Sequence, residues 1–124
     1  MPEIEFTDAG KCVFLTKYHG IVTLSQAKWE IICGEPERRY YRFNGEKIAT
    51  TLINPDIVRY HRHEKNQFFY YKKFARIFTD AGIETPYGTG IFFAVIIDES
   101  TSRICTVYPV EEQKPGKAFV PKPK

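Results

Sequence analysis

The stretch Gly90-Ile91-Phe92-Phe93-Ala94-Val95-Ile96-Ile97 is the one sustained apolar run in the chain, and it decides the fold class. It would be apolar on both faces of a strand, which is typical of a central strand covered on both sides. The run is far shorter than the roughly 20 residues that a membrane helix needs. We therefore expect a sheet with this segment at its centre.

Three further segments around this run have the composition of strands. They cover 57–63, 67–74 and 103–109, with a hairpin loop at His63–Asn66 and a turn at Asp98–Ser102. Residues 77–90 contain Asp80, Gly82, Pro86, Gly88 and Gly90, so we expect a surface excursion there. Four consecutive strands with mostly short connections predict a four-stranded antiparallel meander.

The N-terminal part has helical signals. A hairpin is expected around Asp8–Lys11, followed by a helix over about 24–33 with Thr23 as N-cap and Gln26 at position N3. A second helical region is expected over about 37–53, with a break near Gly45. The predicted fold class is α+β, in which the N-terminal hairpin and the helices pack on the four-stranded sheet.

The chain has 124 residues and a net charge of +3, but the charge is unevenly placed. Residues 113–124 hold four lysines and no acid, which leaves 14 Lys and Arg against 15 Asp and Glu in residues 1–112. We expect a single domain over 1–112 and a flexible, Pro-containing basic tail over 113–124. The overall basicity is therefore weak evidence for nucleic-acid binding, and local clusters have to carry that argument.

The three cysteines, Cys12, Cys33 and Cys105, are widely spaced and form no CxxC pair. Free thiols indicate a reducing compartment, so we expect a cytoplasmic protein. The N-terminus lacks the basic start and apolar segment of a signal peptide. No P-loop, GxGxxG, HExxH or GxSxG motif is present, so we expect no cofactor.

The segment Arg59-Tyr60-His61-Arg62-His63 is the first candidate for chemistry. In a strand, Arg59, His61 and His63 share one face, where Arg could hold a phosphate and His could exchange a proton. The simpler interpretation is a solvated strand end. A metal site at His61 and His63 would need a third ligand, and His19 is the one other histidine.

Residues 55–76 hold six Lys or Arg and six aromatic residues against two acids. Rings that stack on bases, interleaved with cations that hold phosphates, suit single-stranded RNA. The alternative is that the rings are core and the lysines extend from the rim of the sheet. The candidate RNA-binding residues here and in the neighbouring basic segment are Arg62, Tyr70, Lys73, Arg38 and Arg39. On the last strand, Thr106 and Tyr108 share a face and could orient a phosphate, or could be ordinary strand residues.

Three stretches together resemble a known group of small nucleases. They are Ile21–Leu24 leading into a helix with Trp29, the segment Ile48–Asp56 ending Leu-Ile-Asn-Pro-Asp, and Phe69–Lys72 followed by an apolar strand and Thr106–Tyr108. The pattern covers about three quarters of the chain, from residue 21 to residue 117. It is similar to the phage- and toxin-type members of the barnase, EndoU, colicin and RelE-like ribonucleases.

The resemblance implies a metal-independent endoribonuclease in which a base activates the ribose 2′-hydroxyl against the adjacent phosphate. The expected catalytic set is Arg59, His61 and Lys72, with Thr106 and Tyr108 in support and Glu35 as base. Members of the group tend to have His in or just after the Trp helix, where this chain has Glu30 and Glu35. This departure favours the alternative, a non-catalytic RNA- or protein-binding module with the same fold. The expected partner is RNA, with an antitoxin or immunity protein as a second candidate; there is no DNA-specific signal and no membrane partner is expected.

Overall fold

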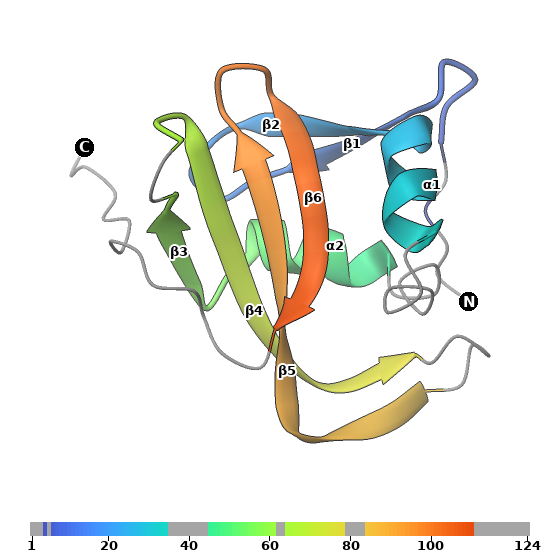
Figure 1. The fold of residues 1–124 in the computed structure, drawn as a ribbon, viewed down its shortest axis with the longest axis vertical. Helices are drawn as coiled ribbons and strands as arrows, with labels where there is room; N and C mark the ends of the chain where they lie inside the picture. The colour runs from blue at the N-terminus through green and yellow to red at the C-terminus, as the bar shows by residue number, and fades with distance from the viewer. Residues whose placement is uncertain (1–3, 5, 35–44, 62–63, 79–83, 111–124) are drawn as a thin grey trace.

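The protein is an α+β structure in which one six-stranded mixed sheet carries two helices on one face (Figure 1). The computed structural model describes residues 4, 6–34, 45–61, 64–78 and 84–110. The strands are β1 (Lys11–Leu15), β2 (Ile21–Ser25), β3 (Ile57–Tyr60), β4 (Gln67–Phe78), β5 (Glu84–Asp98) and β6 (Arg103–Val110). The helices are α1 (Gln26–Gly34) and α2 (Gly45–Ile53).

The strand order is β1-β2-β6-β5-β4-β3, so the chain order and the spatial order differ. Strands β3 to β6 pair antiparallel with their neighbours, and the hairpin β1–β2 joins them through a parallel pairing of Thr23 with Arg103. The predicted α+β class is confirmed, whereas the prediction of a four-stranded antiparallel sheet is wrong. The difference arises because the N-terminal hairpin extends the sheet instead of packing on it.

Two local predictions in the N-terminal part are corrected by the strand register. The predicted turn at Asp8–Lys11 is present, since the Gly10 amide donates to the Thr7 carbonyl at 2.8 Å. The hairpin strands differ from the prediction, because β1 pairs with β2, with Phe14 opposite Val22 and a turn through residues 16–20. The helix begins two residues later than predicted, since Thr23 is still paired in β2. Ser25 takes the N-cap position, and its hydroxyl accepts a hydrogen bond from the Lys28 amide at 3.1 Å.

The segment predicted as a surface excursion at 77–90 is mostly strand. β4 continues to Phe78 and β5 begins at Glu84, with Arg76 opposite Pro86 after a register shift that follows Phe74. A shift of this kind bends a ribbon, and in Figure 1 the far ends of β4 and β5 curve away below the body. The predicted second helix before residue 45 and the tail 113–124 lie outside the described residues.

The side chains form two apolar clusters, one on each face of the sheet. On the helix face, the inward residues of the strands pack with Trp29 and Ile32 of α1 and with Ile48 and Leu52 of α2. On the opposite face, which we call the outer face, Phe69, Tyr71, Ala94 and Ile96 form a second buried cluster. The prediction that the central strand is covered on both sides is therefore confirmed, because Val95 and Ala94 are both fully buried.

Neither helix in the described part of the chain has the length and apolarity that crossing a bilayer requires.

Candidate functional site

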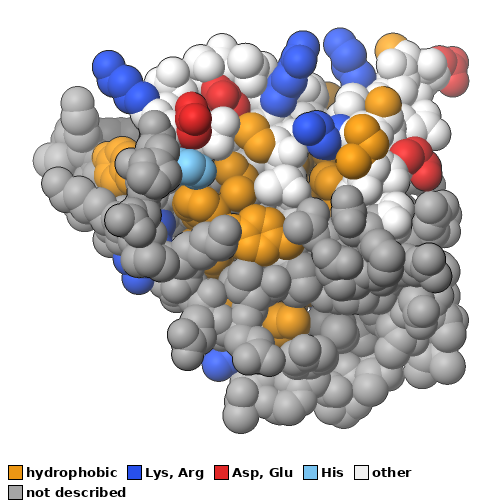
Figure 2. All heavy atoms as spheres, in the orientation of Figure 1, with side chains coloured by type: hydrophobic (Ala, Val, Ile, Leu, Met, Phe, Trp, Pro, Cys, Tyr) orange, Lys and Arg blue, Asp and Glu red, His pale blue; other side chains and the backbone are white. Residues whose placement is uncertain are grey.

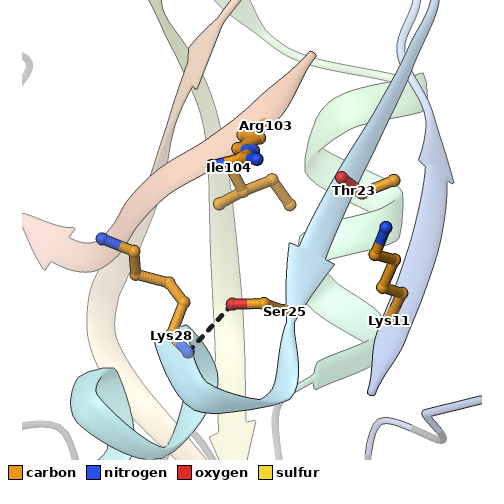
Figure 3. Close-up of a pocket in the computed structure, with 6 residues that line it drawn as sticks. All are labelled: Lys11, Thr23, Ser25, Lys28, Arg103 and Ile104. Carbon is orange, nitrogen blue, oxygen red and sulfur yellow. Dashed lines mark hydrogen bonds between the residues drawn. The ribbon is translucent and has the colours of Figure 1, made fainter. Parts of the chain in front are cut away.

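A basic cleft lies where β2 meets β6 beside the start of α1 (Figure 3). Its volume is about 230 Å³, and its lining residues are Lys11, Thr23, Ser25, Lys28, Arg103 and Ile104. Three of the six side chains are cationic, two carry hydroxyls and none is acidic. A cleft with this lining is suited to an anion, since Lys, Arg and hydroxyl groups are the usual partners of phosphate oxygens.

Strand alternation explains why these side chains meet. Val22 and Leu24 are buried on the helix face, so Thr23 and Ser25 of the same strand point to the outer face. Lys11 of β1 is directly opposite Ser25, and Arg103 of β6 is opposite Thr23. The cleft is thus assembled from residues that are up to 93 positions apart in the sequence, from Lys11 to Ile104.

The close-up shows how the cations are arranged around the cleft. Lys11 and Lys28 lie on opposite sides, with Ser25 and Thr23 between them, and the Lys28 side chain extends toward β6 (Figure 3). This spread fits a chain of phosphates that passes over the cleft better than a single small ion. Figure 2 shows Lys and Arg side chains along the upper part of the face seen there, with acidic, hydrophobic and uncharged side chains between them.

The start of α1 adds a favourable electrostatic contribution. The first turn holds no acidic residue, so the partial positive charge of the helix N-terminus is not offset locally. Lys28 occupies position N3, where a capping box has Glu or Gln. A cation at this position is unfavourable for the helix, and a bound anion would relieve that repulsion.

The β5–β6 turn holds Arg103 at the rim. The Ser102 carbonyl accepts the Thr23 amide at 2.9 Å, and Ser102 itself has a left-handed φ of 54°. Within the turn, the Asp98 carboxylate accepts bonds from the Ser100 hydroxyl at 2.6 Å and the Ser100 amide at 2.9 Å. The hydrogen bond from the Ser100 hydroxyl lowers the pKa of Asp98, which keeps the carboxylate charged and the turn closed.

Cys105 lies just beyond the cleft on β6. Burial raises the pKa of its thiol, the charge of Asp98 raises it further, and the charge of Lys28 opposes both. The thiol is therefore protonated at neutral pH and is not set up as a nucleophile. Since the lining residues include neither a carboxylate nor an imidazole, the described groups of the cleft can bind an anion but offer no general base.

The outer face carries most of the sequence-predicted catalytic residues. Arg59 pairs with Phe69, and the His61 ring stacks on the Phe69 ring at 5.2 Å with an interplanar angle of 13°. Thr106 pairs with Ile96 and Tyr108 with Ala94, which places both on the same face. The predicted alternation of these strands is thus confirmed.

Sharing a face does not bring these residues together. β6 and β3 are separated by β5 and β4 in the sheet, so Thr106 lies about 14 Å from the strand that carries Arg59, at about 4.8 Å per strand. The intervening rings of Phe69 and Tyr71 are 6% and 0% exposed. Arg59 and His61 therefore cannot act on one phosphate with Thr106 and Tyr108.

Lys72 and Tyr70 point to the helix face instead. Lys72 pairs with the buried Phe93, and its ammonium lies 3.5 Å from the Asp56 carboxylate. Tyr70 is fully buried, so it cannot stack on a base, and its prediction as an RNA contact does not fit its position. The expected set of Arg59, His61 and Lys72 is consequently divided between the two faces. Arg59 is opposite Phe69, and Lys72 lies three positions after Phe69 on β4, so strand alternation places it on the other face.

Lys73 is on the outer face and exposed, with its ammonium 5.6 Å from the centre of the Phe92 ring. It remains a candidate RNA contact at the β4 side of the sheet. Four other predicted residues lie outside the described part of the chain: Glu35, Arg38, Arg39 and Arg62.

No group of three or more His, Cys, Asp or Glu side chains is arranged to hold a metal ion within the described residues. His63, one half of the metal pair that the sequence left open, lies outside them. The other half of that pair, His61, is described, and its Nδ1 atom accepts a hydrogen bond from the Glu64 amide at 3.0 Å.

Sequence reasoning missed the three cations of the cleft. Lys11 was part of an expected turn, Lys28 lay on an expected helix surface and Arg103 began an expected strand. One local signal was available: a lysine three residues after an N-cap serine breaks the capping-box preference. The parallel pairing of β2 with β6, which brings the three together, has no signal in the local sequence.

The chain matches no protein-family model, and the comparisons with curated proteins and with solved structures likewise find no match.

Proposed function

We propose that the protein is an RNA-binding module that holds the phosphates of a single strand in the cleft of Lys11, Lys28 and Arg103. The observation that carries this proposal is the convergence of three cations and two hydroxyls in a cleft with no acidic lining residue. Phosphate contacts supply most of the affinity in such complexes. The choice of RNA over DNA comes from the resemblance to small ribonucleases, since phosphates are common to both.

Binding without cleavage is the form of this proposal that the geometry favours. The cleft offers no described base, and the outer-face residues Arg59 and His61 lie two strands or more from β6. Metal-independent cleavage by 2′-hydroxyl attack is kept as the second candidate, because Arg59 and His61 still lie side by side on one face at the edge of the sheet.

The test is fluorescence anisotropy with a labelled single-stranded RNA of 12 nucleotides, in EDTA, at 50 and 200 mM salt. Three phosphate contacts predict a slope of about −2 for the logarithm of affinity against the logarithm of salt, which is a loss of about 20-fold over this range. Arg103→Ala or Lys28→Ala should weaken binding about 5- to 10-fold and reduce the slope by about 0.7.

Lys65→Ala is the matched control, because Lys65 is an exposed cation in the β3–β4 turn that does not line the cleft. Equal losses of RNA affinity for Lys65→Ala and Arg103→Ala would show that net charge alone matters and would contradict binding in the cleft. Absence of binding at 50 mM salt would refute the RNA proposal. Gel analysis of the same samples decides between binding and cleavage, and a DNA strand of the same sequence tests the choice of RNA.

A further inference from the structure

A buried histidine fastens the β1–β2 loop to two other parts of the fold. The side chain of His19 is 2% exposed although it belongs to a surface loop of residues 16–20. Its ring stacks on Phe68 of β4 with centroids 3.9 Å apart. Its Nδ1 atom lies 2.6 Å from the Tyr70 hydroxyl, and its Nε2 atom lies 3.6 Å from a Glu99 carboxylate oxygen in the β5–β6 turn.

The contacts of His19 suit a neutral ring. The Tyr70 oxygen accepts the Tyr18 amide at 3.3 Å, and burial raises the pKa of Tyr70 to about 12, against a hydrogen bond with the Thr16 side chain that lowers it, so the hydroxyl keeps its proton. In the tautomer of the neutral imidazole with its hydrogen on Nε2, Nδ1 can accept the Tyr70 hydroxyl proton and the Nε2 hydrogen faces Glu99. Burial lowers the pKa of His19, and the charge of Glu99 opposes this effect.

We propose that His19 is an acid-sensitive latch: neutral, it holds the β1–β2 loop on β4 and on the β5–β6 turn, and protonation releases the loop. A protonated ring would present N–H groups on both nitrogens, so Nδ1 could no longer accept the Tyr70 hydroxyl proton. It would also place a positive charge among Phe68 and Tyr70, where burial disfavours it. The charged or titratable groups around the latch are Tyr70 on β4, Glu99 on the β5–β6 turn, Tyr18 and Lys17 on its own loop, and Tyr60, which packs on Phe68 from β3.

The sign of the pH effect follows from linkage. Because the folded-state pKa of His19 lies below the unfolded value of about 6.5, the unfolded chain binds more protons between the two values. The latch contributes its full stability above about pH 6.5 and loses it as the pH falls through the folded-state value.

The direct test is NMR of the wild-type protein, with the His19 ring nitrogens and Hε1 followed from pH 8 to pH 5. The latch predicts a neutral ring at pH 7.5 with its proton on Nε2, a midpoint below about 6.5, and lower amide protection factors at Tyr18 and His19 below that midpoint, after the intrinsic pH dependence of exchange has been divided out. A ring that is charged at pH 7.5, or a midpoint at or above 6.5, would overturn it. Unchanged amide exchange across the midpoint would also overturn it.

Two variants should move the midpoint in opposite directions. Tyr70→Phe removes the donor that stabilises the neutral ring, so the midpoint should rise; Glu99→Gln removes the charge that favours the protonated ring, so the midpoint should fall. Shifts in the reverse directions would contradict the assigned hydrogen bonds. His19→Gln should remove part of the loss of melting temperature between pH 7.5 and pH 5.5, and a loss as large as that of the wild type would contradict the latch.

The latch also bears on the cleft, because the same hairpin supplies Lys11, Thr23 and Ser25. If the proposed RNA binding is correct, release of the loop should weaken it at pH 5.5 in the wild type and less in His19→Gln. This last measurement rests on the proposed function. The NMR and melting measurements do not, so a failure of RNA binding leaves the latch testable.

Discussion

Ser102 is the one described residue other than glycine that adopts a left-handed φ, and it does so at the rim of the cleft. Left-handed backbone is unfavourable for residues with a Cβ atom. Two groups hold it there: Asp98 closes the turn through Ser100, and the Ser102 carbonyl accepts both the amide and the hydroxyl of Thr23. The strain at Ser102 is thus associated with the junction that positions Arg103.

We expect Ser102→Gly to stabilise the protein by about 0.5–1 kcal/mol, since glycine adopts this conformation without steric cost. Thermal unfolding should show a rise in melting temperature of about 2–5 °C. Ser100→Gly is the control in the same turn, and it should destabilise because it removes the hydroxyl that Asp98 accepts. A Ser102→Gly protein less stable than the wild type would show that the backbone is not strained there.

At the scale of elements, the start of α1 shows a conflict between helix stability and the anion binding that we propose. Ser25 caps the helix well, yet the N3 position holds Lys28 instead of an acid. A cation near a helix N-terminus costs about 0.3–1 kcal/mol relative to a favourable charge. Lys28 is exposed, so its position is not required by the core.

Lys28→Glu should therefore raise stability while it abolishes RNA binding. The acid completes a capping box with Ser25 and interacts favourably with the helix N-terminus, which predicts a gain of about 0.5–1 kcal/mol. In the cleft, the same change replaces attraction for phosphate by repulsion. Chemical denaturation tests the gain in stability, and anisotropy on the same preparation tests the loss of RNA binding. A variant that loses stability and binding together would indicate a structural role for Lys28 instead.

At the scale of the whole molecule, the sheet has one part with extensive strand pairing and one part with little pairing to the rest. β4, β5 and β6 pair over long registers around fully buried residues such as Tyr70 and Val95. The β1–β2 hairpin joins them through one described pair, Thr23 with Arg103, besides its packing on the core. The cleft and the His19 latch lie on this junction.

Native-state hydrogen exchange should reflect this difference. We expect the amides of Ala94 and Val95, at the centre of the sheet, to exchange only on global unfolding, and the bonded amides of β1 and β2 to exchange through a smaller opening of lower free energy. Leu24→Ala should lower the protection of the hairpin further, because it leaves a cavity between the hairpin and the core. Equal protection of Phe14, whose amide pairs with β2, and Val95 would show that the sheet opens as one unit.

Sequence periodicity was sufficient for much of the sheet. The central strands were predicted from three features: the strand composition of 67–74, the apolar run at 90–97 and the turn at Asp98–Ser102. All three are local properties of the chain. The same reasoning failed at Thr23, where a helix-cap pattern competes with strand pairing. It also failed at 77–90, where Gly and Pro indicated a loop but pairing between β4 and β5 formed strand.

What the sequence by itself determined is the α+β class, the central strand, and that Arg59 shares a face with His61 and Thr106 with Tyr108, since each depends on neighbours in the chain. Only the tertiary structure decided that the two pairs lie on β3 and β6, with β4 and β5 between them. It also decided that Tyr70 holds His19 in the interior and that Lys11, Lys28 and Arg103 form one cleft. The physical reason is that the parallel pairing of β2 with β6 joins segments about 80 residues apart, and such pairing depends on the packing of the whole sheet rather than on any local pattern.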